Sequence, residues 1–264
     1  MKRVCLIAIL ILLQICAFLF QKYTELSAQD TYIGIKAGPS IPSLKGGTTE
    51  ESKGYKSRLA PVIGITSSIE FKSQLALQLE ISYVGQGGVK NGTQLITPGM
   101  INYPGLPSFD LYADFKNMVV LNYIEVPILA KYSIPVEKLF NVFFDAGPNF
   151  GFLISAKTKT SGSSQVYTDK EGTPLNDQLG KPLPPADFDR NTNIKKDLNT
   201  LNIGVTGGAG IINEFETGEL LIELRASYGF SDIQKDPENG KNHTGNLIIT
   251  LGYRLKYNPF KKHK

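Results

Sequence analysis

Seven charged residues stand out because they occur inside otherwise apolar segments of the sequence. They are Glu80, Glu125, Lys131, Asp145, Glu223, Arg225 and Arg254. A lone charge away from water is costly, whereas paired and hydrogen-bonded charges offset that cost. The sequence therefore predicts a buried network of carboxylates, guanidinium groups and an ammonium group, with Arg225 and Arg254 as bidentate partners of nearby carboxylates. We interpret this network as a structural plug, and keep a proton path or a ligand site as the alternative.

Other chemistry has little support in the sequence. The chain has only two histidines, His243 and His263, and no Ser-His-Asp set or cluster of metal ligands can be assembled around them. The glycine-rich stretch NIGVTGGAGI at 202–211 is not part of a strand–GxGxxG–helix unit, so it does not predict a phosphate-binding loop. We expect no catalytic residue, no metal site, no cofactor and no enzymatic activity.

Segments with a period of two residues must position the charges. In NLIITLGYRLKY at 246–257, apolar side chains alternate with a face that carries Arg254 and Lys256. The same alternation recurs along the chain and predicts eight strands. They are Thr31–Pro39, Leu59–Phe71, Gln74–Val84, Met118–Ile134, Phe140–Ala156, Asn199–Ile212, Glu219–Phe230 and Gly245–Tyr257.

The connections between these segments alternate in length. Short links are expected at Lys72–Ser73, Pro135–Leu139 and Asn213–Gly218, and long polar links at Ser40–Ser57, Gly85–Asn117, Lys157–Leu198 and Ser231–Thr244. Tight turns at one rim and long loops at the other are typical of an outer-membrane barrel. The sequence therefore predicts an all-β fold, an eight-stranded antiparallel up-and-down transmembrane β-barrel, with solvated loops outside that need not pack into a core. Pro127 and Pro148 fall inside strands, and we expect a β-bulge at each.

The N-terminus has the pattern of a secretory signal peptide. Lys2 and Arg3 precede an apolar run from Val4 to Phe20, which is followed by a polar segment that ends at Ala28. We expect a signal peptide over 1–28, the barrel over 29–257 and a basic tail over 258–264, with an uncleaved anchor or a lipid-modified Cys16 as alternatives. Both cysteines lie before the expected cleavage site, so the exported chain would have no disulfide. It would keep 25 basic and 23 acidic residues, a near-neutral balance that gives no reason to expect nucleic acid.

Several segments resemble the PorT-like outer-membrane β-barrel family. They include YIGIKAGPS at 32–40, FFDAGPNFGFLI at 143–154 and, most specifically, NYIEVPILAKY at 122–132. The resemblance implies an eight-stranded barrel and, for the branch that gives the family its name, a part in secreting proteins across the outer membrane. The chain departs from the pattern in having no tryptophan and in continuing past its last strand with NPFKKHK. These departures leave Tyr257 or Phe260 as the aromatic of the barrel-insertion signal.

Together these features predict a Gram-negative integral protein of the cell outer membrane. We expect a closed, non-channel lumen and a structural or interaction role through the long loops, chiefly 85–117 and 157–198, where a protein partner would bind. Outer-membrane lipid is the other expected partner, and we expect a monomer. Two alternatives stay open: a component of a protein-secretion system, and a soluble lipocalin-like carrier of an apolar ligand, whose oily face would point inward.

Overall fold

Eight long strands form a closed antiparallel ring, as the sequence predicts. The computed structural model describes residues 30–71, 74–96, 100 and 109–257, so the expected signal peptide, the Lys72–Ser73 link and the basic tail lie outside the described residues. The ring consists of β1 (Asp30–Gly46), β2 (Ala60–Glu70), β3 (Leu75–Leu95), β4 (Tyr112–Glu137), β5 (Phe140–Ser161), β10 (Leu201–Glu214), β11 (Glu219–Gly229) and β12 (Asn242–Tyr257).

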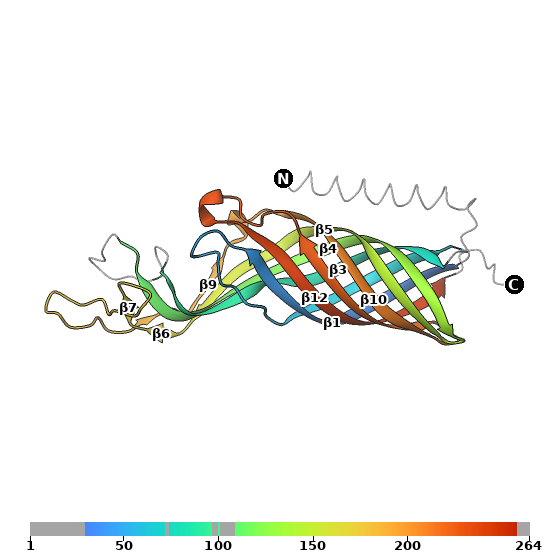
Figure 1. Cartoon of the computed structure of the whole chain (residues 1–264), viewed down its shortest axis with the longest axis horizontal. Helices are drawn as coiled ribbons and strands as arrows, with labels where there is room; N and C mark the ends of the chain where they lie inside the picture. Colours follow the sequence, from blue (N-terminus) through green and yellow to red (C-terminus); the bar gives the residue numbers. More distant parts are fainter. Residues whose placement is uncertain (1–29, 72–73, 97–99, 101–108, 258–264) are drawn as a thin grey trace.

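The ring closes where the first strand meets the last. Each strand pairs with its neighbour in the chain, β5 pairs with β10, and β1 pairs with β12 in a register that places Ile33 opposite Leu255. In Figure 1 the strands run obliquely around the barrel. Because β1 pairs with β12, the sheet has no free edge within the ring. No helix within the described ranges is long and apolar enough to cross a membrane.

Side chains alternate between the outside and the interior of the ring along most of each strand. Leu77, Leu224 and Leu251 on the outside are 38%, 51% and 55% exposed. Glu80, Glu223 and Arg254 on the opposite faces of the same strands are 1%, 6% and 3% exposed. The apolar face therefore points outward and the charged face inward. This orientation rules out the soluble carrier, which needs an apolar interior.

Four strands, β1, β3, β4 and β5, are longer than the sequence predicts, and β1 continues through residues 40–46, which were expected to belong to a loop. Residues 85–95 belong to β3 and residues 112–117 belong to β4, although the whole of 85–117 was expected to be a loop. Gly85 pairs with Asn122 and Leu95 with Tyr112, so backbone hydrogen bonding continues where the alternating side-chain pattern is lost. The outer ends of β3, β4 and β5 thus leave the ring as a ribbon, which we call the extension (Figure 1).

The connection 157–198 is also more ordered than expected. It contains the end of β5, the short strands β6 (Ser163–Ser164), β7 (Val166–Tyr167), β8 (Ala186–Asp187) and β9 (Arg190–Asn193), and the 3₁₀ helix η1 (Lys195–Asp197). β9 pairs with β5, and β7 with β4. Phe188 is fully buried, with its ring stacked 4.9 Å from that of Phe115. The prediction that this loop needs no core was wrong, because its few apolar side chains pack on the outer end of β4.

The strands pass both mid-strand prolines without a bulge. Pro127 lies opposite Asn149 and Pro148 opposite Val205, in unbroken register. The irregularities between β4 and β5 fall instead at Asn122/Tyr123 and Pro135/Glu137. The expected bulges at the two prolines were therefore wrong: the register does not shift there, although Pro127 has no partner in β3 and Pro148 has none in β4.

Candidate functional site

Arg225 stands at the centre of a charged layer inside the barrel. It projects inward from β11 because it shares strand parity with Glu223. Its two terminal nitrogens bind the two carboxylate oxygens of Glu80 at 2.8 and 3.0 Å, in the bidentate geometry that the sequence predicts. The same guanidinium donates to Asp145 Oδ2 at 3.0 Å and to Glu223 Oε1. One side chain thus connects carboxylates from β3, β5 and β11.

Lys36 completes this layer from β1. Its Nζ lies 2.6 Å from Glu80 Oε2 and 3.3 Å from Glu223 Oε2. Lys131 lies beside the layer, since its Cα is paired with that of Asp145, and its Nζ sits over the ring of Phe143 at 4.1 Å. Counting Lys131, three cations face three carboxylates. We call Lys36, Glu80, Asp145, Glu223 and Arg225 the charge plug.

Arg254 belongs to a second cluster, nearer the rim with the short turns. It donates through Nε to Glu219, through Nη2 to Glu70 Oε1 at 2.8 Å, and through Nη1 to Ser68 Oγ at 3.0 Å. Its guanidinium carbon lies 4.2 Å from the centroid of the Tyr32 ring. Arg254 therefore bridges two carboxylates and does not bind one of them in the expected bidentate geometry.

Glu125 lies apart from both clusters. Its two oxygens accept hydrogen bonds from Gln86 Nε2 and Asn149 Nδ2, both at 2.8 Å. The structure thus brings together Glu80, Asp145, Glu223 and Arg225, with Lys131 beside them, and places Glu125 and Arg254 at other heights of the same interior. Glu219 was missed, although it has the same parity as Glu223 and is only 6% exposed.

An apolar layer separates the charges from the rim with the long connections, which we call the outer rim. Leu121, Tyr123 and Leu153 are at most 2% exposed and point inward from β4 and β5. Leu44, Leu198 and Ile233 belong to the same cluster and come from the outer ends of other elements. Along β4 toward the outer rim, the inward side chains therefore change from the charged Lys131 and Glu125 to the aromatic Tyr123 and then to the amide of Asn117.

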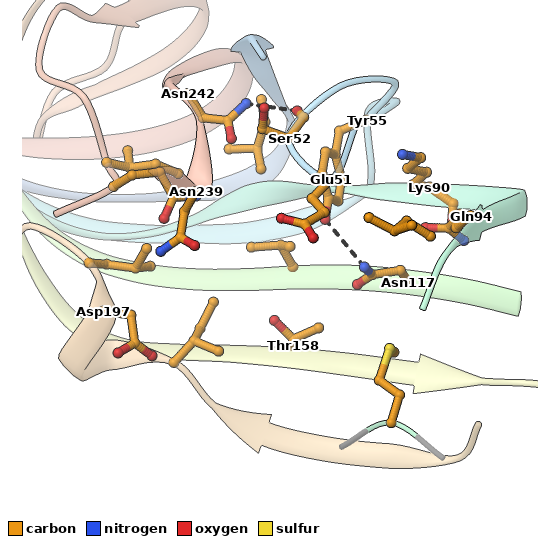
Figure 2. Close-up of a pocket in the computed structure, with 18 of the residues that line it drawn as sticks. Glu51, Ser52, Tyr55, Lys90, Gln94, Asn117, Thr158, Asp197, Asn239 and Asn242 are labelled. Carbon is orange, nitrogen blue, oxygen red and sulfur yellow. Dashed lines mark hydrogen bonds between the residues drawn. The ribbon is translucent and has the colours of Figure 1, made fainter. Parts of the chain in front are cut away.

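A cavity of about 430 Å³ opens at the outer rim above the apolar layer. Figure 2 shows side chains from the β1–β2 connection, the extension, η1 and the β11–β12 connection around it. Leu44, Val119, Leu198 and Ile233 form its apolar lining, and Glu51, Lys90, Asn117 and Asp197 are among the polar groups. A pocket of this size and mixed lining is typical of a small-molecule site.

Tyr55 and Asn117 form a polar pair within this cavity. Asn117 Nδ2 donates to the Tyr55 phenol oxygen at 3.3 Å, and Asn117 Oδ1 is buried without a hydrogen-bond partner among the described residues. Burial, followed by the negative charge of Glu51, raises the pKa of the Tyr55 phenol to about 12. The phenol therefore keeps its proton at physiological pH and can donate it.

The sequence does not predict the cavity. Its lining residues come from segments without a regular pattern, and only the closed ring and the folded extension bring them together. His243, the histidine within the described residues, is directed elsewhere, with its Nδ1 3.2 Å from the Ser231 carbonyl. Within the same part of the chain, no group of three or more His, Cys, Asp or Glu side chains could hold a metal ion.

The chain was compared with known protein families, curated sequences and solved structures. A family model described as an outer membrane protein beta-barrel domain matches residues 27–235. Solved structures similar to this chain include Neisserial surface protein A, at 12% identity, with 86% of this chain and 97% of that chain covered and a TM-score of 0.39. The outer membrane protease OmpT from Escherichia coli, at 10% identity, has coverages of 88% and 98% and a TM-score of 0.42. Ail, the attachment invasion locus protein of Yersinia pestis, at 14% identity, has coverages of 86% and 100% and a TM-score of 0.33. No curated protein sequence matches the chain.

Proposed function

Since the chain belongs to the outer membrane protein beta-barrel family and lies in the cell outer membrane, we propose that it is a non-conducting barrel that acts through its outer rim and extension. The charge plug is the observation that carries this proposal. Its ion pairs join β1, β3, β5 and β11 across the interior, so a solute would have to break buried salt bridges to pass.

The space around the plug supports the same conclusion. Two cavities of about 20 Å³ each adjoin the plug, one lined by Lys131 and Arg254 and the other by Glu125 and Asn149. A space of this size has room for about one water molecule. An eight-stranded barrel has an interior that side chains can just fill, so the plug and the apolar layer together would block ions as well as larger solutes.

The extension supports an interaction role outside the membrane. Beyond Gly88, which pairs with Val119 of the cavity lining, residues 89–95 of β3 would extend about 23 Å at the usual rise of a β-strand. Phe115, Ala113 and Phe188 give the extension a small core of its own, so it keeps a defined shape in water. Ordered structure of this length is not needed to close a barrel, and it offers a surface to a protein partner. No catalytic step is part of this proposal.

Conductance in a planar lipid bilayer tests the proposal. The full chain should insert without opening steady ion channels. The double variant Glu80→Ser/Arg225→Ser, which removes the central pair of the plug and shortens both side chains, should raise the frequency of conducting events. The variant Lys170→Met, which removes an exposed ion pair of the outer connections, should stay silent like the wild type. Steady conductance of the wild-type protein would refute the closed lumen.

A part in protein secretion remains a prediction of the resemblance to the PorT-like branch. The secretion role and the proposed interaction role both place the working surface at the outer rim. Loss of secretion in a deletion strain, restored by the wild-type chain but not by a chain with a shortened extension, would favour it.

A further inference from the structure

Four lysines lie side by side at the base of the extension. Lys157 and Lys159 are two residues apart on β5 and share one face of the strand. Lys116 lies diagonally opposite Lys159 in the paired strand β4. Lys157 pairs with Asn193 of β9, and Lys195 of η1 follows two residues later. We call Lys116, Lys159, Lys157 and Lys195 the lysine ladder.

A β-bulge turns two of these lysines outward. Leu153 points into the apolar layer, so strict alternation along β5 would also point Lys157 and Lys159 inward. β5 gains one residue against β4 directly after Leu153, and the side chains beyond this point change face. Ala156 therefore takes the inward position, where it is 1% exposed, and both lysines are exposed on the outer face.

The lysine ladder has few counter-charges. Within the described ranges, none of its four lysines forms an ion pair. Asp114 and Asp189 lie at the outer end of the ladder, beyond Lys116, and each already accepts a hydrogen bond from a neighbouring group. Asp197 lies two residues after Lys195 in η1, but it lines the outer-rim cavity (Figure 2). The lysine ladder therefore carries a net positive charge, and its complement is an anion.

The ladder stands directly above the lipid-facing apolar band. Ile154 is the last outward apolar residue of β5 and is 43% exposed, and Lys195 Nζ donates to its carbonyl oxygen at 2.8 Å. Lys157 follows three residues later, which is about 10 Å along the strand and about 8 Å along the membrane normal at the usual strand tilt. The headgroup region on each side of the hydrocarbon core is about 5–8 Å deep. The ammonium groups, on flexible stems, therefore reach the headgroups.

Phosphate groups are the anions that this layer supplies. In the outer leaflet of an outer membrane, phosphorylated sugars form the headgroup of the main glycolipid. Neighbouring lysines of the ladder are about 7 Å apart at the usual strand spacings, so one phosphate group can contact two ammonium groups. Lysine binds phosphate as a point charge and needs no fixed geometry. Flexible ammonium groups therefore suit a lipid headgroup that moves in the plane of the membrane.

We propose that the lysine ladder binds the phosphate groups of the outer-leaflet glycolipid and so fixes the base of the extension against the membrane surface. An acidic segment of a protein would first have to displace the headgroups that surround the lysines at this height, so the lipid is the partner that fits. This inference goes beyond the proposed function. It needs the location in the outer membrane but not the closed lumen.

Native mass spectrometry of the full chain in detergent micelles tests the proposal, with bisphosphorylated lipid A as the probe. A lysine near an anionic lipid surface strengthens binding about fivefold. Lys116→Gln/Lys157→Gln/Lys159→Gln should therefore bind lipid A about a hundredfold more weakly than the wild type. Lipid A without its phosphates should bind the wild type just as weakly. Lys256→Gln serves as the matched control, because Lys256 is paired with Asp30 at the opposite rim, and it should bind lipid A like the wild type.

Replacing the same three lysines by arginine keeps the charge and should keep the binding. Unaltered binding by the triple glutamine variant, or equal binding of lipid A with and without phosphates, would overturn the proposal. Displacement of lipid A by an equal concentration of a hexaglutamate peptide or of inorganic phosphate would overturn it too, because the surface would then select an acidic protein or a free anion.

Heat-modifiable gel mobility of each variant establishes that it is folded, so loss of binding cannot be mistaken for loss of the barrel. The bilayer measurement stays independent of this test. A silent bilayer without lipid A binding refutes only the ligand of the lysine ladder, and a conducting wild type refutes the closed lumen.

Discussion

Replacing Arg225 by Gln should remove the cation that connects the charge plug. The wild-type guanidinium makes four hydrogen bonds to three carboxylates and is 4% exposed. After the substitution, Glu80 and Glu223 keep their ion pairs with Lys36, whereas Asp145 loses the ion pair that it makes with Arg225. Leaving buried charge uncompensated costs about 3–5 kcal/mol, and we expect this loss in the free energy of unfolding.

The double-mutant cycle with Glu80→Gln isolates the bidentate pair. If Arg225 and Glu80 interact as the distances indicate, Glu80→Gln/Arg225→Gln should lose less stability than the sum of the two single variants, with a coupling energy of about 2 kcal/mol. Arg225→Lys keeps the charge but cannot bind several carboxylates with a planar fork, so it should recover part of the loss.

Urea unfolding in lipid vesicles measures these changes. The chain has no tryptophan, so the folded fraction is followed by circular dichroism and by gel mobility. Lys170→Met serves as the control, because Lys170 and Glu50 form an ion pair in which both side chains are at least half exposed. The urea midpoint of this variant should not move measurably. An Arg225→Gln variant as stable as the wild type would refute the reasoning, since the buried carboxylates would then not need their partner.

Three further changes have defined outcomes. Phe188→Ala should cost about 3–5 kcal/mol within the extension, because it removes a fully buried ring stacked on Phe115, and hydrogen exchange should accelerate there while the barrel stays protected. Tyr55 should give a tyrosinate absorbance change centred near pH 12, which Tyr55→Phe abolishes. Because the phenol of the unfolded chain ionises near pH 10, the wild-type fold should lose stability above pH 10, and the Tyr55→Phe variant should lose less. Gly210→Ala should destabilise the barrel, because a Cβ there would lie 2.5 Å from Phe143 Cζ and 2.3 Å from the Ile222 carbonyl oxygen, and the urea midpoint should fall.

Strand alternation predicted most of the charges that face inward, with Glu219 as an exception, but not how they pair. Arg225 and Glu80 are 145 residues apart, and their contact depends on the register and tilt of strands that lie on opposite sides of the ring. The pattern of inward residues is the same for any register that shifts by two residues. The sequence could therefore predict that these charges form a buried group. It could not predict that Arg254 binds two separate carboxylates.

The extension shows where side-chain patterns stop being informative. Residues 85–95 read GQGGVKNGTQL, which has the glycine content of a loop, yet they pair with β4 through the backbone. Backbone pairing does not require alternating side chains once neighbouring strands fix the geometry. The outer-rim cavity was beyond prediction for a related reason, because the closed fold alone places segments as distant in the chain as Glu51 and Asp197 around one cavity.

The central claim is that lipid covers the apolar outer face of the barrel while charged side chains fill its interior. Spin-label accessibility tests this claim most directly. Single cysteines at Leu77, Leu224 and Leu251, in a chain with Cys5 and Cys16 replaced by alanine, are labelled with nitroxides and reconstituted in vesicles. The three labels should collide readily with oxygen dissolved in the bilayer and hardly at all with a water-soluble nickel complex. Free collision of these labels with the nickel complex would contradict the account, because the apolar face would then lie against water.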